Sequence, residues 1–144
     1  MIKAILTYPK DKEVLTQPSQ EVDNIEEVQE LIQDLKDTMH FSGGKGISAI
    51  QIGVPKRICI CSWGGQEITM INPVITRSRG NTMFHEGCLS VPGRYIDVPR
   101  AQKVWCSYTD ENGNKCEIAE GGRMSNIIQH ELDHFEGWCP VIED

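Results

Sequence analysis

The spacing of apolar residues changes twice along this chain, and this change constrains the fold more than any other feature. From Ile25 to Met39, apolar residues recur every three or four positions, as on one face of an α-helix. The middle of the chain consists of short, β-branched or alternating stretches, and the helical spacing returns from Met124 to Phe135. We therefore expect an α+β fold with an N-terminal helix and mostly antiparallel sheets packed around a C-terminal helix.

Residues at the helix ends support both helices. Asp23 or Asn24 can cap the first helix, because short polar side chains accept hydrogen bonds from the free N–H groups of a first turn. Its apolar run stops before Gly43, and Gly137 is placed to end the second helix. Glycine commonly follows helices because it adopts the left-handed conformation at little cost.

Five stretches between the helices predict strands. They are separated by turn residues and by connections too short for helical crossovers, so neighbouring strands should run antiparallel. Asn112-Gly113 predicts a hairpin turn between the last two strands, since both residues tolerate positive φ angles. The predicted strands are Arg57–Trp63, Gln66–Ile71, Val74–Arg77, Lys103–Thr109 and Lys115–Ala119.

Length and charge narrow the class of protein. Residues 1–144 contain no internal repeat and no linker-like segment, so a single domain is expected. The net charge of −7 disfavours nucleic acid as a partner, because binding to phosphate backbones needs a basic surface. We find neither a signal peptide nor an apolar run that could cross a membrane, so a cytoplasmic location and six reduced cysteines are expected.

The segment His130-Glu131-Leu132-Asp133-His134 lies in the second predicted helix and indicates a metal site. A four-residue step turns about 40° around a helix, so the two histidines project side by side and can share one ion. Glu131 lies within about 60° of His134, close enough to take a proton from a metal-bound water. Alternatively, the histidines fall by chance on an exposed face, but the flanking apolar stripe indicates a buried segment.

A catalytic metal site usually has three protein ligands and a position for water, so one ligand is missing from this helix. The ten residues after His134 do not match the downstream ligands of HExxH proteases, so the third ligand is expected upstream. Cys88 is the leading candidate, because Gly87 beside it lets the backbone approach closely and a thiolate is a strong ligand. A buried structural cysteine is the competing interpretation. The other upstream candidates are His40, His85, Glu86, Cys59, Cys61, Cys106 and Cys116.

Three segments, in order and spacing, resemble the signature motifs of the peptide deformylase family. The resemblance covers nearly the whole chain, and it implies a hydrolase that removes the formyl group, as formate, from the N-terminal formyl-methionine of nascent polypeptides. The three segments are Gly44-Lys45-Gly46-Ile47-Ser48-Ala49-Ile50-Gln51, Glu86-Gly87-Cys88-Leu89-Ser90 and Gln129-His130-Glu131-Leu132-Asp133-His134.

The resemblance implies a metal centre with an acid–base residue beside it. The implied ligands are Cys88, His130 and His134, and Glu131 is the implied general acid and base. The family typically uses ferrous iron and accepts nickel, cobalt or zinc, so one Fe²⁺ per chain is expected. Ligand chemistry alone would favour zinc for one cysteine and two histidines. The implied location is the cytosol of a bacterium or of a phage-infected host.

The resemblance also implies how the substrate is held. The side-chain amide of Gln51 and the backbone N–H of Leu89 donate hydrogen bonds to the formyl oxygen as it gains negative charge. The backbone near Gly46 pairs with the substrate peptide as an added strand. Glu86 and Arg100 can form an ion pair that fixes the cysteine loop, or can remain solvated separately. The implied substrate-binding residues are Lys45, Gly46, Gly87 and Ile127.

The sequence departs from the family at Lys45 and Ser48, where a loop that presents backbone should tolerate the change, and more consequentially at two further places. Arg123 and Asn126 occupy positions where relatives place apolar residues that line the pocket for the methionine side chain, whereas Ile127 is retained. The chain also ends ten residues after His134, as in short deformylases of phages, without the C-terminal helix that docks some relatives on the ribosome. Contact with the ribosome is therefore expected to be transient at most.

Two other functions remain open on the sequence alone. An HExxH-type metallopeptidase would cleave unformylated peptides, although the missing downstream ligand argues against it. A non-catalytic metal-binding or partner-binding module would show no turnover, although the presence of both Gln51 and Glu131 favours an enzyme.

Overall fold

Two antiparallel sheets and several helices make up the fold in the computed structural model, which describes residues 1–142. The strands are β1 (Gly46–Ser48), β2 (Ile58–Trp63), β3 (Gln66–Arg79), β4 (Thr82–Cys88), β5 (Val91–Arg100), β6 (Lys103–Thr109) and β7 (Lys115–Gly121). The α-helices are α1 (Lys12–Leu15), α2 (Gln29–Ser42) and α3 (Gly122–Phe135), and the 3-10 helices are η1 (Ile25–Val28), η2 (Ala49–Ile52) and η3 (Pro140–Ile142).

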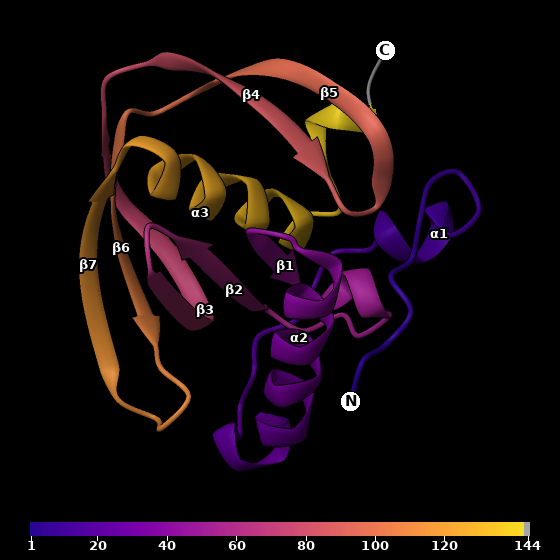
Figure 1. The fold of residues 1–144 in the computed structure, drawn as a ribbon. Coiled ribbons are helices and arrows are strands. Elements are labelled where there is room, and N and C mark those ends of the chain that lie inside the picture. Colours follow the sequence, from indigo (N-terminus) through magenta and orange to yellow (C-terminus); the bar gives the residue numbers. More distant parts are fainter. Residues whose placement is uncertain (143–144) are drawn as a thin grey trace.

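The larger sheet has the strand order β1-β2-β3-β6-β7, and β4 and β5 form a separate hairpin. Neighbouring strands are antiparallel in both sheets. Helix α3 lies between the hairpin and the larger sheet (Figure 1). This confirms the predicted α+β class, with antiparallel sheets around a C-terminal helix. In the described part of the chain, no helix is long and apolar enough to cross a membrane.

Strand β2 is buried on both faces and divides the apolar core into two parts. Ile58 and Ile60 pack in the part that contains the apolar face of α2. Cys59 and Cys61 point to the opposite face, because successive side chains of a strand alternate, and they pack in the part that contains α3. The two predicted helices therefore cover opposite faces of the strand, and this arrangement fixes α3 against the sheet.

The predicted helix ends are largely confirmed. The side chain of Asn24 accepts a hydrogen bond from the backbone N–H of Glu26 at 3.0 Å, but the first turn is the 3-10 helix η1, and α2 begins only at Gln29. Gly43 ends α2 in the left-handed conformation, with φ 70°. Gly137 adopts a similar conformation two residues after α3, with φ 76°.

The prediction of separate strands at Gln66–Ile71 and Val74–Arg77 was wrong, because both belong to β3. Register shifts interrupt the pairing of β3 with β6, and such bulges break the alternation that a sequence pattern relies on. At the first shift, Asn72 has φ 51° and its side chain exchanges two hydrogen bonds with the backbone of Val22. The predicted hairpin between β6 and β7 is confirmed, although of Asn112 and Gly113 only Gly113 has a positive φ, of 86°.

The hairpin of β4 and β5 was not predicted, although it carries Cys88. Most of its side chains are partly or fully exposed, so it lacks the regular apolar alternation of a half-buried strand. Proline and glycine, at Pro92, Gly93 and Pro99, also reduce its β propensity. Its pairing is visible only once the chain is folded.

Candidate metal centre and substrate cavity

Helix α3 and strand β4 bring the three predicted metal ligands together. His130 and His134 lie one turn apart on α3, with ring centroids separated by 5.1 Å, and both are buried. Cys88 is the last residue of β4, where a register shift after Gly87 interrupts the pairing with β5. A bulge of this kind turns a side chain away from its strand direction. The Cys88 Sγ consequently lies 3.4 Å from His134 Nε2.

A fourth side chain joins these three. Candidate donor atoms of Cys88, His130, His134 and Cys139 all lie within 4.8 Å of one another. The third ligand was expected upstream of His134, where Cys88 lies, and Cys139 was not considered. That expectation considered only histidine and glutamate at protease spacings, and the turn that brings Cys139 back is a tertiary feature.

The chemistry of these donors fits a divalent transition metal. Thiolates and imidazoles are the ligands that zinc and comparable ions prefer. His130 Nδ1 lies 2.8 Å from a Glu86 oxygen, which leaves Nε2 for an ion, and metal-binding histidines usually hydrogen-bond a carboxylate in this way. His134 also faces the other donors with Nε2, since that atom is the one near Cys88.

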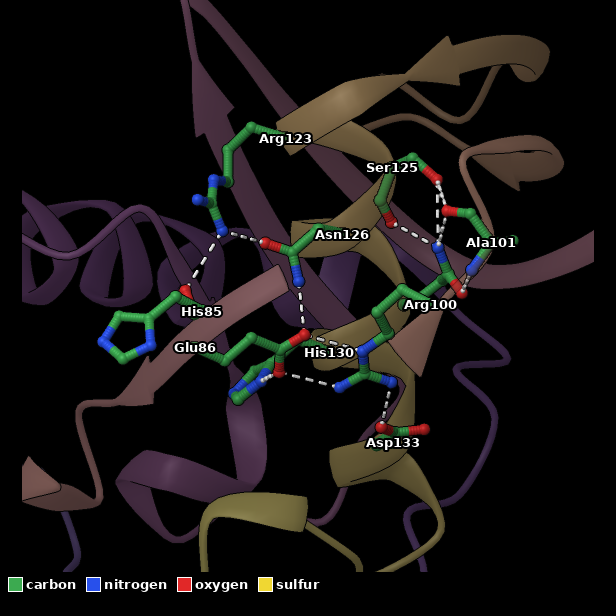
Figure 2. A network of polar contacts seen from close by, with 10 residues as sticks. His85, Glu86, Arg100, Ala101, Arg123, Ser125, Asn126, His130 and Asp133 are labelled. Atoms are coloured by element: carbon green, nitrogen blue, oxygen red, sulfur yellow. Dashed lines mark hydrogen bonds and ion pairs between the residues drawn. The ribbon is translucent and has the colours of Figure 1, made fainter. Parts of the chain in front are cut away.

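Glu86 is the centre of a buried polar network that supports His130 (Figure 2). Arg100 donates to the two carboxylate oxygens of Glu86 at 2.7 and 2.9 Å and to Asp133 at 2.6 Å, so the predicted Glu86–Arg100 pair is confirmed. Burial alone would raise the pKa of Glu86, but the hydrogen bonds from Arg100 and His130 outweigh it and lower the pKa to about 2. Glu86 is therefore a carboxylate that holds the His130 ring in one orientation.

The same network extends to the cavity wall through Asn126 and Arg123 (Figure 2). The Asn126 side-chain amide donates to Glu86, and the Arg123 guanidinium donates to Asn126 Oδ1 at 2.7 Å and to the backbone oxygen of His85 at 3.2 Å. Two polar side chains thus form part of the cavity wall and are linked, through Glu86, to His130.

Glu131 lies on the cavity side of α3 and is almost fully buried. The Ser48 hydroxyl lies 2.9 Å from a Glu131 carboxylate oxygen and 3.0 Å from its backbone oxygen. Burial raises the pKa of Glu131 to about 7, although the positive charge of His130 and the Ser48 contact act in the opposite direction. A Cβ atom on Gly46 would lie 2.4 Å from Glu131 Oε2, so only glycine leaves room for this carboxylate.

Ser48 and Gln51 hold each other in place. Gln51 is buried, and its side-chain oxygen accepts a hydrogen bond from the backbone N–H of Ser48 at 2.9 Å, as in a capping box at the start of η2. This contact points the Gln51 amide nitrogen at Ser90 Oγ, 3.1 Å away, and at Cys88 Sγ, 3.6 Å away. No local pattern in the sequence indicates that Ser48 contacts Glu131, because the two residues are 83 positions apart.

A cavity of about 700 Å³ opens beside these donors. It lies between the edge of β1, the hairpin and α3, and Arg123 and Asn126 form part of its wall. A Cβ atom on Gly87 would lie 2.4 Å from the Tyr95 ring, so glycine allows that ring to cover the cysteine loop. His134 lies behind the cavity. The predicted site residues that line it are Lys45, Gly46, Gln51, Gly87, Cys88, Leu89, Ile127, His130 and Glu131.

Comparisons with known proteins agree on one family. The sequence model described as polypeptide deformylase matches residues 2–141. A peptide deformylase of Aquifex aeolicus is 38% identical over 144 residues, covering 95% of this chain and 84% of the relative. One of Pelagibacter ubique is 39% identical over 143 residues, covering 94% and 82%. A solved peptide deformylase from Legionella pneumophila has a TM-score of 0.91 at 38% identity, covering 96% of this chain and 83% of that chain.

Proposed function

Because this chain belongs to the peptide deformylase family, we propose that Cys88, His130 and His134 hold the metal ion on which its reaction depends. The protein is a metal-dependent hydrolase that removes the formyl group, as formate, from the N-terminal formyl-methionine of polypeptides. One observation supports the assignment of the site. The three ligands lie together beside the cavity that Gln51 and Glu131 line.

We propose one Fe²⁺ per chain as the native metal, with Ni²⁺, Co²⁺ or Zn²⁺ able to replace it. A bound ion supplies a Lewis acid beside the cavity. The family resemblance supports iron, whereas the thiol and imidazole donors would also suit zinc. Metal analysis of anaerobically purified, active protein tests this proposal, and zinc alone with full activity would contradict it.

Glu131 acts as the proton carrier in this proposal. Its carboxyl group accepts a proton from the attacking water and returns it to the amine that leaves. Burial raises the pKa of this carboxyl group, which favours its accepting a proton and returning it. The contact with Ser48 fixes one carboxylate oxygen, and Gly46 has no side chain to cover the other. Burial and position thus support the assigned role.

Gln51 and Leu89 stabilise the negative charge that develops on the formyl oxygen. The Gln51 amide is fixed by its contacts with Ser48 and Ser90, so no reorientation is needed when the charge appears. Leu89 follows Cys88 directly and lines the cavity, which supports its backbone N–H as the second donor. Such donors commonly contribute about 3 kcal/mol each to the stability of the transition state.

The substrate peptide binds beside β1 as an added strand. Strand β1 is at the edge of the larger sheet, and its partner strand β2 occupies only one side. Lys45 and Gly46 line the cavity at this edge, where extended backbone can pair with a peptide. Ile127 and Gly87 line the same cavity and contact the substrate within it.

Formate release from a formyl-Met-Ala-Ser peptide by protein loaded with Fe²⁺ or Ni²⁺ tests the proposed function. We expect release of formate and no cleavage of the same peptide without its formyl group. Absence of formate under both loading conditions would contradict the proposal. Cleavage of internal bonds in unformylated peptides would instead support a metallopeptidase.

The proposed substrates are nascent chains, so the cytosol of a bacterium or of a phage-infected host is the proposed location. Contact with the ribosome is proposed to be transient, because a net charge of −7 disfavours lasting attachment to ribosomal RNA. Sedimentation with ribosomes at low and at physiological salt tests this. A stable ribosome-bound fraction at physiological salt would contradict it.

A further inference from the structure

We propose that Cys139 is a fourth protein ligand of the metal, an inference that rests on the proposed set of Cys88, His130 and His134. The candidate donor atoms of all four side chains lie within 4.8 Å of one another. Cys139 is fully buried, so its thiol cannot serve as a surface thiol. The structure therefore places two sulfur and two nitrogen donors together. The family motifs account for only one of the sulfur atoms and the two nitrogen atoms.

The spacing of these atoms suits a single ion. Ligands bound to zinc at about 2.3 Å for sulfur and about 2.0 Å for nitrogen lie roughly 3.5 Å apart at tetrahedral angles. Cys88 Sγ and His134 Nε2 are already 3.4 Å apart. No pair in the group exceeds 4.8 Å, so side-chain shifts of roughly 1 Å or less bring all four donors into bonding range.

The turn after α3 directs Cys139 toward the site. The backbone N–H of Gly137 donates to the His134 oxygen at 3.1 Å, and that of Trp138 donates to the Asp133 oxygen at 3.1 Å, so the chain folds back on the helix. Only glycine fits at position 137, for two reasons. Its φ is 76°, and a Cβ atom there would lie 2.2 Å from the backbone oxygen of Thr16. Cys139 follows two residues later, which places its thiol beside Cys88.

The other buried cysteines have a different setting. Cys59, Cys61 and Cys106 pack in the apolar cluster of β2, β3, β6 and α3. Within residues 1–142, none of these three belongs to a group of side chains that could hold a metal. Apolar packing accounts for these cysteines, whereas Cys139 lies beside a thiol and two imidazoles.

A fourth ligand at this place leaves the reaction side of the site open. Cys88, His130, Gln51 and Glu131 line the cavity, but Cys139 is not among the described residues that do so. Its side chain is fully buried, as that of His134 is. Water and the formyl group can still reach the site from the cavity, since catalytic zinc sites tolerate five ligands. A second thiolate also favours soft divalent ions.

X-ray absorption spectroscopy of the wild-type protein, loaded with Zn²⁺ under a non-chelating reductant, tests the proposal without any mutation. We expect two sulfur scatterers in the first shell, together with at least two nitrogen or oxygen scatterers. One sulfur would overturn the proposal.

Variants provide a second test, with Co²⁺ as the probe. Cys139→Ser should reduce the sulfur-to-cobalt charge-transfer absorption by about half and raise the dissociation constant for Zn²⁺ at least about tenfold. Cys106→Ser, a matched change at a buried cysteine outside the group, should leave both unchanged. Equal spectra and affinities for Cys139→Ser and the wild type would overturn the proposal. Formate release by the wild type is scored separately, so failure of either proposal can be distinguished.

Discussion

At the scale of single residues, the Glu131 side chain is buried, is held by Ser48 and has a raised pKa. Glu131→Gln keeps the size and the contact with Ser48 but removes the ability to carry a proton. We expect kcat for formate release to fall about a thousandfold, because general acid–base catalysis commonly contributes a factor of that order. Metal content should stay at the wild-type value. Retention of activity would refute the assignment of Glu131 as the acid and base.

Arg123 and Asn126 determine the polarity of the cavity wall, and Arg123 is the simpler residue to change because Asn126 also supports Glu86. Arg123→Leu should favour apolar substrate side chains, since an apolar group packed against the guanidinium displaces water from its charge. We expect the ratio of kcat/KM for formyl-Met over formyl-Gln peptides to rise about tenfold. Loss of metal or of folded protein lowers both kcat/KM values equally and does not change their ratio. An unchanged ratio would show that Arg123 does not select the substrate.

At the scale of elements, the turns after α2 and α3 look alike in backbone but differ in surroundings. Gly43 and Gly137 both have positive φ, yet a Cβ atom at Gly43 meets nothing within 4 Å, whereas one at Gly137 would lie 2.2 Å from the Thr16 oxygen. The turn after α3 is therefore packed against the N-terminal segment, and it sets the position of η3 and Cys139.

Alanine at these two positions should separate conformational strain from steric conflict. Gly43→Ala should lower the free energy of unfolding by about 1 kcal/mol, through the left-handed backbone alone. Gly137→Ala should lower it by about 3 kcal/mol, because the backbone of Thr16 must also move. Urea unfolding of the two variants measures the difference. Equal losses would show that the contact with Thr16 carries no cost.

At the scale of the whole molecule, the network around Glu86 joins parts of the chain that are distant in sequence. It connects β4 through Glu86, β5 through Arg100 and α3 through His130 and Asp133. The network holds the hairpin, which contributes the metal-ligand candidate Cys88, against the helix that carries the histidines. The stability of the fold and the geometry of the site therefore depend on the same carboxylate.

This dependence predicts a particular loss of stability in acid. The folded pKa of Glu86 lies below its usual value of 4.5, at about 2, so its contribution is complete above 4.5 and is lost as pH falls toward 2. The shift corresponds to about 3 kcal/mol of stability at neutral pH. Glu86→Gln should be less stable than the wild type at pH 7 in metal-free protein, and the difference should narrow as pH falls from 4.5 to 2.

The exposed pair of His85 and Asp97, on the same hairpin, provides the control. Both side chains are about two-thirds exposed, and surface pairs contribute little because water screens them. Asp97→Asn should change the free energy of unfolding by less than about 0.5 kcal/mol at every pH. A pH-independent difference between Glu86→Gln and the wild type would contradict the role of the buried network.

The two long helices α2 and α3, most strands of the larger sheet and the pairing of His130 with His134 could be predicted from the sequence, because they follow from spacing within a few residues. The motifs of the sequence also determined the family. Only the tertiary structure decided the hairpin of β4 and β5, the contact of Ser48 with Glu131 and the position of Cys139. The physical reason is that each depends on packing between segments distant in the chain or on an irregular turn. Such contacts leave no periodic pattern in the sequence.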